Sequence, residues 1–153
     1  MNDRIYRGFL LGMAATFFMT VVHMLIITAS GHMSVTAVTS DMLPEIIVIK
    51  ILGPSLAVPL RVVLGMLLHF GYGGFWGSVL FALAPRVTVS KGIAMGVFLY
   101  LIMQVFLFPF LGRGIFGTAI PHRTLAQMLL PVATHLTYGT VLGYLGSRRD
   151  AAA

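Results

Sequence analysis

Four stretches of the chain contain no charged residue, and charged positions separate them. They cover residues 8–40, 62–85, 92–112 and 124–147. Each is at least as long as the ~20 apolar residues that an α-helix needs to cross the hydrocarbon core of a bilayer. Lipid offers no hydrogen bonds to a bare backbone, so segments of this kind are expected to form helices. The pattern predicts an all-α membrane protein.

Four transmembrane helices are predicted, over residues 5–29, 61–84, 91–111 and 125–146. Pro85 ends the second because its ring cannot continue the hydrogen-bond ladder, and Pro109 is expected to kink or stop the third. The segment 43–58 is apolar but contains Lys50 and a Gly-Pro break, so it is too short to span. It predicts a short interfacial or re-entrant helix on the outer face, with an ordinary loop helix as the alternative.

The sequence also repeats itself. Arg7-Gly8-x3-Gly12-x6-Met19 is matched by Lys91-Gly92-x3-Gly96-x6-Met103, and His69-x2-Tyr72-Gly73-x3-Gly77 by His135-x2-Tyr138-Gly139-x3-Gly143. We therefore expect a single domain, 1–153, built from two units, 1–85 and 90–147. Each unit has two spans, so both run in the same direction. This predicts a parallel repeat about a pseudo-twofold axis along the membrane normal.

Every predicted span carries one pair of glycines four residues apart. The pairs are Gly8/Gly12, Gly73/Gly77, Gly92/Gly96 and Gly139/Gly143. Glycines at this spacing let helix backbones approach closely, which is how helices associate in lipid without a hydrophobic drive. Four pairs at repeat-matched positions predict a compact, tightly crossed four-helix bundle.

Charge refines this picture. Charged residues make up 9% of the chain, against ~25% in a soluble domain. The net charge is +6, but the basic residues lie at the ends of spans without an aromatic-interleaved face, which argues against nucleic-acid binding. There is no cysteine, so disulfides and thiolate metal sites are excluded.

The distribution of basic residues predicts the orientation. Basic residues in short loops favour the cytoplasm. One side of the four-span topology holds Arg4, Arg7, Arg86, Lys91, Arg148 and Arg149, and the other holds Lys50, Arg61, Arg113 and Arg123. Both termini are therefore predicted to be cytoplasmic. The first apolar run exceeds the usual length of a signal-peptide core, so it is predicted to be a retained helix.

Three histidines fall within predicted spans, where an ionisable residue is a functional candidate. His69 and His135 occupy matching repeat positions, and His23 lies at a comparable depth in the outer half of the bilayer. Two opposed histidines in a helical bundle are the usual ligands of a b-type haem. Three could instead hold copper or zinc. Thioether ligands for copper(I) could come from Met19, Met24, Met66 and Met103.

The alternative is that these histidines only join helices. A neutral imidazole can hydrogen-bond a polar neighbour on the next helix, and Tyr72, Tyr138 and Gln104 supply such partners. No acidic residue lies in any predicted span, which removes the usual carboxylate relay or cation site of a coupled transporter. The sequence has no metalloprotease or phosphate-loop motif and no serine-histidine-acid set. An enzymatic function is not expected.

One further motif is Gly92-x3-Gly96 followed by Phe108-Pro109-Phe110-Leu111-Gly112. In this motif and in the helices around His69 and His135, the chain resembles the YagU-like group of small bacterial and archaeal inner-membrane proteins. The resemblance covers most of residues 65–146 and a glycine-patterned first helix. It implies a multi-pass fold in the cytoplasmic membrane and almost nothing about chemistry.

The sequence supports three functional hypotheses. The first is a non-enzymatic membrane protein, an accessory subunit of a larger membrane complex or a small-ligand scaffold, centred on His69 and His135. The second is a haem b- or copper-binding protein that serves respiratory electron transfer or cofactor delivery. The third is a small permease that works as a homo-oligomer.

Overall fold

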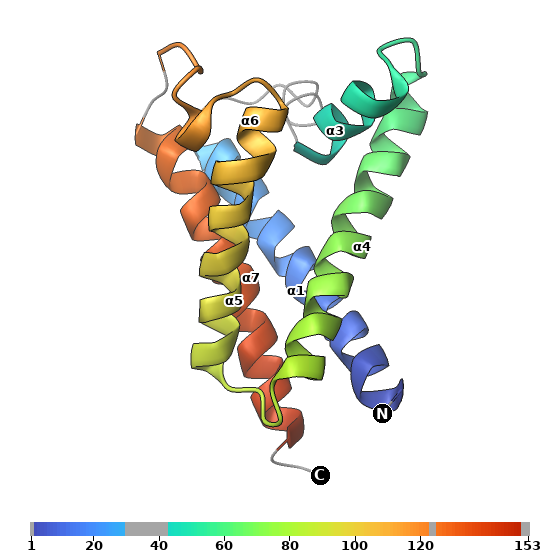
Figure 1. Ribbon diagram of the computed structural model, residues 1–153, viewed down its shortest axis with the longest axis vertical. Coiled ribbons are helices and arrows are strands. Elements are labelled where there is room, and N and C mark those ends of the chain that lie inside the picture. Colours follow the sequence, from blue (N-terminus) through green and yellow to red (C-terminus); the bar gives the residue numbers. More distant parts are fainter. Residues whose placement is uncertain (1, 30–42, 123–124, 151–153) are drawn as a thin grey trace.

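The computed structural model describes residues 2–29, 43–122 and 125–150, and its regular structure in these ranges is entirely helical. Four long helices dominate: α1 (Asn2–Ala29), α4 (Val58–Leu83), α5 (Val89–Ile102) and α7 (Leu125–Asp150). A short helix, α3 (Leu43–Leu52), precedes α4. The π-helix η1 (Met103–Leu107) continues α5 into α6 (Phe108–Phe110), and a 3-10 turn, η2 (Ile115–Gly117), follows. Figure 1 shows this arrangement.

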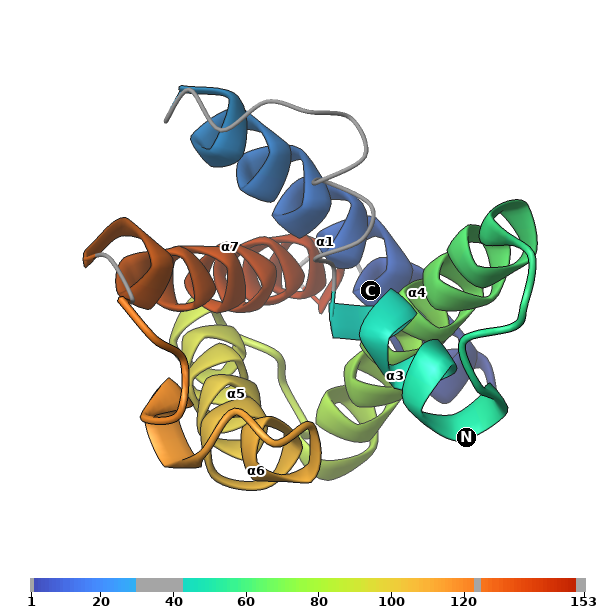
Figure 2. The ribbon, with the colours of Figure 1, turned by 90° about the horizontal axis from the view of Figure 1, so that it is seen from above.

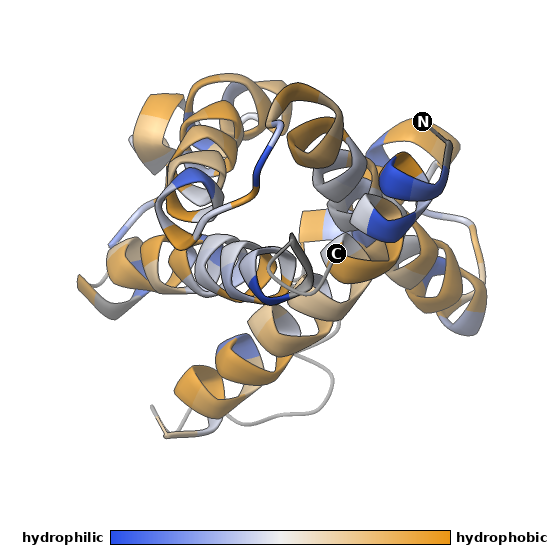
Figure 3. Cartoon of the chain, turned by 90° about the horizontal axis from the view of Figure 1, so that it is seen from below, coloured by the Kyte–Doolittle hydropathy of each residue, from blue (hydrophilic) through white to orange (hydrophobic). Residues whose placement is uncertain are grey.

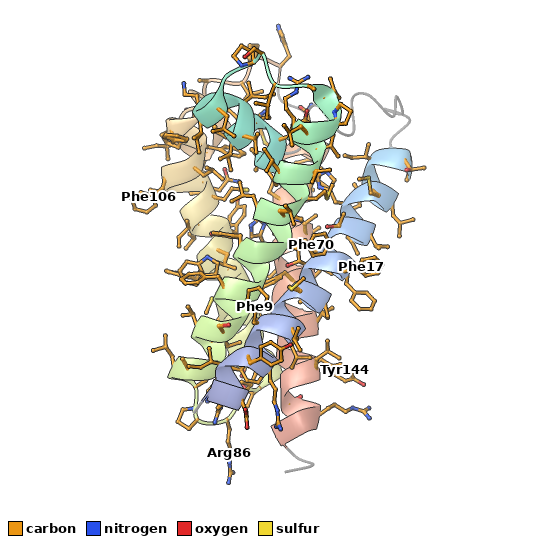
Figure 4. All side chains as sticks on the ribbon, turned by 90° about the vertical axis from the view of Figure 1, so that its right-hand side faces the viewer. Phe9, Phe17, Phe70, Arg86, Phe106 and Tyr144 are labelled. Carbon is orange, nitrogen blue, oxygen red and sulfur yellow. The ribbon has the colours of Figure 1, made fainter. Side chains whose placement is uncertain are left out.

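Three of these helices are long and apolar enough to cross a membrane, namely Asp3–Ala29, Val58–Leu83 and Val89–Phe110. Large apolar side chains project outward from them, such as Phe17 and Phe106, which are 55% and 70% exposed (Figure 4). The all-α fold and the membrane class expected from the sequence are thus confirmed. Helix α7 has the same length but is less apolar, because it carries polar residues such as Thr134, His135 and Tyr138.

The four long helices form an open ring in the order α5, α7, α1, α4 (Figure 2). α1 packs along α4, α5 packs along α7, and α1 also packs along α7. By contrast, α4 and α5 make few contacts. A strict twofold axis relating the two predicted units would repeat the α1–α7 contact between α5 and α4. The packing between the units therefore departs from a strict twofold axis, and the parallel repeat about a pseudo-twofold axis stays a prediction.

Within each helix pair, glycines lie where the backbones cross. A methyl group added at Gly8 would lie 2.7 Å from the Gly77 carbonyl oxygen, and one at Gly12 would collide with the Gly73 carbonyl. In the second pair, methyl groups at Gly92 and Gly139 would each collide with the other residue's carbonyl oxygen. Such distances allow no side chain, so each pair depends on glycine for its close approach.

The two crossings differ in register by one helical turn. In the first pair, Gly12 faces Gly73. The matching residue of the second pair, Gly96, faces the carbonyl of His135, four residues before the glycine that matches Gly73. Helix α7 is therefore displaced along α5 by one turn relative to α4 along α1, because four residues make about one turn.

Pro109 shapes the end of the third span. Ahead of it the helix widens into the π-turn η1, in which the Phe108 amide donates to the Met103 carbonyl. A wider turn makes room for the proline ring, which would clash with a carbonyl four residues earlier. Gly112, with φ 76°, ends the helix. The Gly112 amide donates to the Pro109 carbonyl, and the Arg113 amide donates to the Phe108 carbonyl. These two hydrogen bonds form a Schellman motif, which satisfies the last carbonyls of the helix.

Helix α3 lies across the end of α4 that is farther from the termini (Figure 1). The backbone of Glu45 packs on Gly65 of α4, where a methyl group would lie 3.2 Å from the Glu45 amide nitrogen. The buried Glu45 carboxylate lies 3.8 Å from the Arg61 guanidinium at the start of α4. The short, non-spanning helix predicted over 43–58 is thus present, ending at Leu52 before the Gly-Pro break.

Both termini and the α4–α5 connection lie at the opposite end of the molecule (Figure 1). Basic side chains tie this end together, because Arg4 donates to the Ala84 carbonyl and Lys91 to that of Arg86 at 2.7 Å. Arg86 itself points away from the helices (Figure 4). Hydrophilic residues also stand out near the N-terminus when the molecule is seen from this end (Figure 3).

Candidate polar site between α4 and α7

A hydrogen bond between Tyr138 and Gly73 joins α7 to α4. The Tyr138 hydroxyl donates to the Gly73 carbonyl at 2.6 Å, and the tyrosine side chain is 2% exposed. His135 lies three residues before Tyr138, and His69 lies four residues before Gly73. Since both helices rise ~1.5 Å per residue, the two histidines sit at similar depth, about one turn from this bond. They are the centre of the candidate site.

His69 is held by the first helix of its own pair. Its Nε2 lies 3.1 Å from the Thr20 hydroxyl of α1, and that hydroxyl donates its single proton to the Thr16 carbonyl at 2.9 Å. Both contacts can be hydrogen bonds at once only if Nε2 of His69 carries the proton and the Thr20 oxygen accepts it, and we assign the tautomer on this basis. This leaves Nδ1 of His69 as an unprotonated acceptor.

His135 carries the opposite tautomer. Its Nδ1 lies 2.7 Å from the Pro131 carbonyl on its own helix, and a carbonyl oxygen only accepts. Nδ1 is thus the protonated nitrogen, and Nε2 carries the lone pair. The ring also packs edge-on against Tyr100 of α5, with 6.1 Å between the ring centroids. His69 is therefore positioned by α1, and His135 by a carbonyl of its own helix and by Tyr100 of α5.

The one-turn displacement of the second pair explains the difference in partners. By the repeat, Thr20 matches Gln104 and Thr16 matches Tyr100. His69 meets Thr20, but His135 meets Tyr100, one turn earlier on the matching helix. The sequence repeat predicts matching positions for the two histidines, and the shifted register gives them different partners.

A separate unpaired acceptor lies on Gln104. It lies in the π-turn η1, one turn beyond Tyr100, and is 1% exposed. Its side-chain oxygen finds no hydrogen-bond donor among the residues that the structure describes. An unpaired polar group buried in this way is rare and costs about 1–3 kcal/mol. The sequence predicts only a supporting role for Gln104, and the signal for a separate role is a lone amide in an apolar span.

Each histidine therefore offers one acceptor atom to the site. Nδ1 of His69 and Nε2 of His135 can accept, while Tyr138 and the threonines direct their protons to backbone carbonyls. His23 lies on α1 three residues beyond Thr20, near enough to His69 to interact electrostatically, as does His135. The arrangement can bind a molecule that brings hydrogen-bond donors.

The three-histidine metal centre considered from the sequence is not formed in this structure. Within the described ranges, no three histidine or acidic side chains converge as a metal ion requires. The physical reason is that His69 directs Nε2 to Thr20 and His135 directs Nδ1 to Pro131, so each ring is oriented by a separate partner. A haem held through both Nε2 atoms would require His69 to give up its contact with Thr20.

The two repeat-matched tyrosines have different environments. Tyr138 is buried against α4, whereas Tyr72 is 43% exposed and its ring lies edge-on to Trp76, with 6.1 Å between centroids. This difference follows from the packing, because α7 packs along α1 and Tyr138 reaches Gly73 of α4 with its hydroxyl, whereas α4 makes few contacts with α5.

No family model, curated protein or solved structure matches the chain. The resemblance to the YagU-like group accordingly stays a prediction, and the function is argued from the geometry of the site.

Proposed function

We propose that this chain is a non-enzymatic membrane protein of four spans that holds a small ligand between α4 and α7. In this proposal α7 is the fourth span, and the pairs α1–α4 and α5–α7 are copies of one unit. The glycine crossings at matching positions of both pairs support the common origin. On α7, the polar residues Thr134, His135 and Tyr138 are buried, while Leu129 and Leu136 are exposed, as lipid contact requires.

Unused acceptor atoms carry the proposed ligand binding. A site meant only to join helices would pair its acceptors with donors from the next helix, as Tyr138 pairs with Gly73. Instead, His69 and His135 each keep one ring nitrogen outside the hydrogen bonds that orient the rings. A ligand with donor groups can bond to these nitrogens.

Native mass spectrometry of the protein, released gently from its own membranes, tests the proposal. We expect a co-purifying small molecule on the wild type that is lost from a His69→Phe, His135→Phe double variant. A His122→Phe variant is the matched control, because His122 is exposed and outside the spans. A visible absorption scan of the same sample reports on haem.

Two results would contradict the proposal. One is a wild-type protein without any bound molecule, together with a double variant of unchanged stability, which would reduce the histidines to packing. The other is a strong Soret band, which would restore the haem alternative that the tautomer of His69 argues against.

A further inference from the structure

Helices α1 and α4 form a groove on the outer surface of their pair, near the end of the molecule that holds both termini. The groove has a volume of about 310 Å³ and is lined by Ile5, Tyr6 and Phe9 of α1 and by Ser78 of α4. Ile5 and Tyr6 are 37% and 63% exposed, so the groove opens outward. We call it the α1–α4 groove. Both helices are candidate spans, so the groove faces the bilayer.

Small residues on α4 produce the groove. Gly74 and Ser78 lie four residues apart, on one face of the helix, opposite larger side chains of α1. The Phe9 ring lies over Gly74, where a methyl group would approach it to 2.7 Å. The Ser78 hydroxyl donates to the Ile5 carbonyl at 3.0 Å. This polar group is therefore satisfied within the protein, and hydrocarbon can cover it without breaking a hydrogen bond.

The groove runs toward an end of the molecule with excess positive charge. Phe9 lies about one helical turn farther from this end than Ile5. The basic side chains described at this end are Arg4, Arg7, Arg86, Lys91 and Arg148, and the acidic side chain described there is Asp3. Basic side chains at a membrane surface attract anionic lipid headgroups. The charge of this end is thus complementary to a phosphate at the mouth of the groove.

The size of the groove fits a lipid chain better than a protein. A stable protein interface engages ~20 residues on each side, whereas four residues line the groove. A flexible acyl chain can lie along Tyr6 and Phe9 while its headgroup stays at the depth of the basic side chains. Arg7 directly follows Tyr6 and is exposed, and the exposed Arg86 points away from the helices at the same end (Figure 4).

We propose that the α1–α4 groove seats one acyl chain of an anionic phospholipid, whose phosphate binds the arginines at the basic end. The lipid belongs to the leaflet at that end of the protein. This site is separate from His69 and His135 and does not depend on the ligand proposed there. A zwitterionic lipid and a second copy of the chain are the competing occupants.

Native mass spectrometry of the full chain tests the lipid class. The protein is taken from nanodiscs that contain equal amounts of phosphatidylglycerol and phosphatidylcholine with identical acyl chains. We expect one phosphatidylglycerol to stay bound per chain, at least about fivefold more often than phosphatidylcholine, the factor that one arginine near the membrane surface supplies. Equal retention of the two lipids would overturn the proposal.

Variants that change the shape of the groove test the location. Ser78→Leu places a larger side chain in the groove and should lose the bound lipid. Ala94→Leu is the matched control, because Ala94 is exposed on α5 and, like Ser78 on α4, lies five residues from the helix end near the termini. Tyr6→Ala removes an exposed wall without touching the glycine crossing, and it should also lose the lipid if Ser78→Leu fails to fold.

Charge variants test the headgroup contact. A double variant, Arg7→Gln with Arg86→Gln, should retain both lipids equally. Lys50→Gln with Arg113→Gln removes the same charge from the opposite end and should keep the preference for phosphatidylglycerol. Lipid retention that survives both Ser78→Leu and Tyr6→Ala would overturn the site. A wild-type dimer without bound lipid, split by Ser78→Leu, would also overturn it and assign the groove to a second copy.

Discussion

At the scale of single residues, the decisive feature is which nitrogen of each histidine ring carries the proton. The Thr20 hydroxyl has one hydrogen, and if it goes to the Thr16 carbonyl, His69 must donate from Nε2 to make its own bond to Thr20. The carbonyl of Pro131 fixes the opposite tautomer in His135. Neither result could be predicted from the sequence, because it depends on which helix each ring faces. The positions and depth of the histidines could be predicted, because they depend only on spacing along a span.

Tyr138→Phe tests the bond between α7 and α4. Removal of the hydroxyl loses the 2.6 Å hydrogen bond to Gly73 and should lower the free energy of unfolding by about 0.5–1.5 kcal/mol. Tyr144→Phe is the control, since Tyr144 lies on the same helix, is exposed and should change stability little. Unfolding in bilayer-mimetic detergent with added dodecyl sulfate measures both. Equal effects of the two substitutions would show that the Tyr138 bond contributes nothing.

At the scale of helices, glycine determines which elements pair. The charge-free stretches predicted the four long helices to within a few residues, because length and apolarity are local properties. The glycine pairs lie at the crossings, where a Cβ would meet backbone. The one-turn displacement between the pairs was not predictable, because a Gly-x3-Gly pattern can engage its partner at more than one level.

Gly77→Ala should lower the free energy of unfolding by about 1–3 kcal/mol, because its new methyl group would collide with the Gly8 carbonyl. Gly71→Ala on the same helix is the matched control, since a methyl group there meets nothing within 4 Å. That variant should keep or raise stability, by up to about 1 kcal/mol, because alanine has the higher helix propensity. A Gly77→Ala protein as stable as Gly71→Ala would refute close packing at this crossing.

At the scale of the whole molecule, the open ring is the feature that sequence reasoning missed. A repeat suggests symmetry, but the contact between the units is made by α1 with α7 and is not repeated by α5 with α4. Tyr138 illustrates the cause. It reaches across to Gly73, while its repeat mate Tyr72 stays at the open side. Contacts between units depend on all faces at once, and no single stretch of sequence encodes them.

The ends of the molecule permit a test of orientation. Both termini and the α4–α5 connection share one end, which carries Arg4, Arg86 and Lys91. By the positive-inside rule we expect this end in the cytoplasm. In intact cells, an impermeant maleimide should label Ser55→Cys, exposed beside α3, and should spare Arg86→Cys until the membrane is opened. Labelling in the reverse order would invert the topology.

The most direct test of the polar site is nitrogen-15 magic-angle-spinning NMR of histidine-labelled protein in lipid bilayers. The nitrogen-15 signals of each histidine are assigned by the spectrum of a variant in which that histidine is replaced. The account predicts that His69 carries its proton on Nε2 and His135 on Nδ1, and that Thr20→Val changes the His69 signals while His135 keeps its own. Two rings of the same tautomer, or rings protonated at both nitrogens, would leave no pair of bare acceptors and would contradict the proposed site.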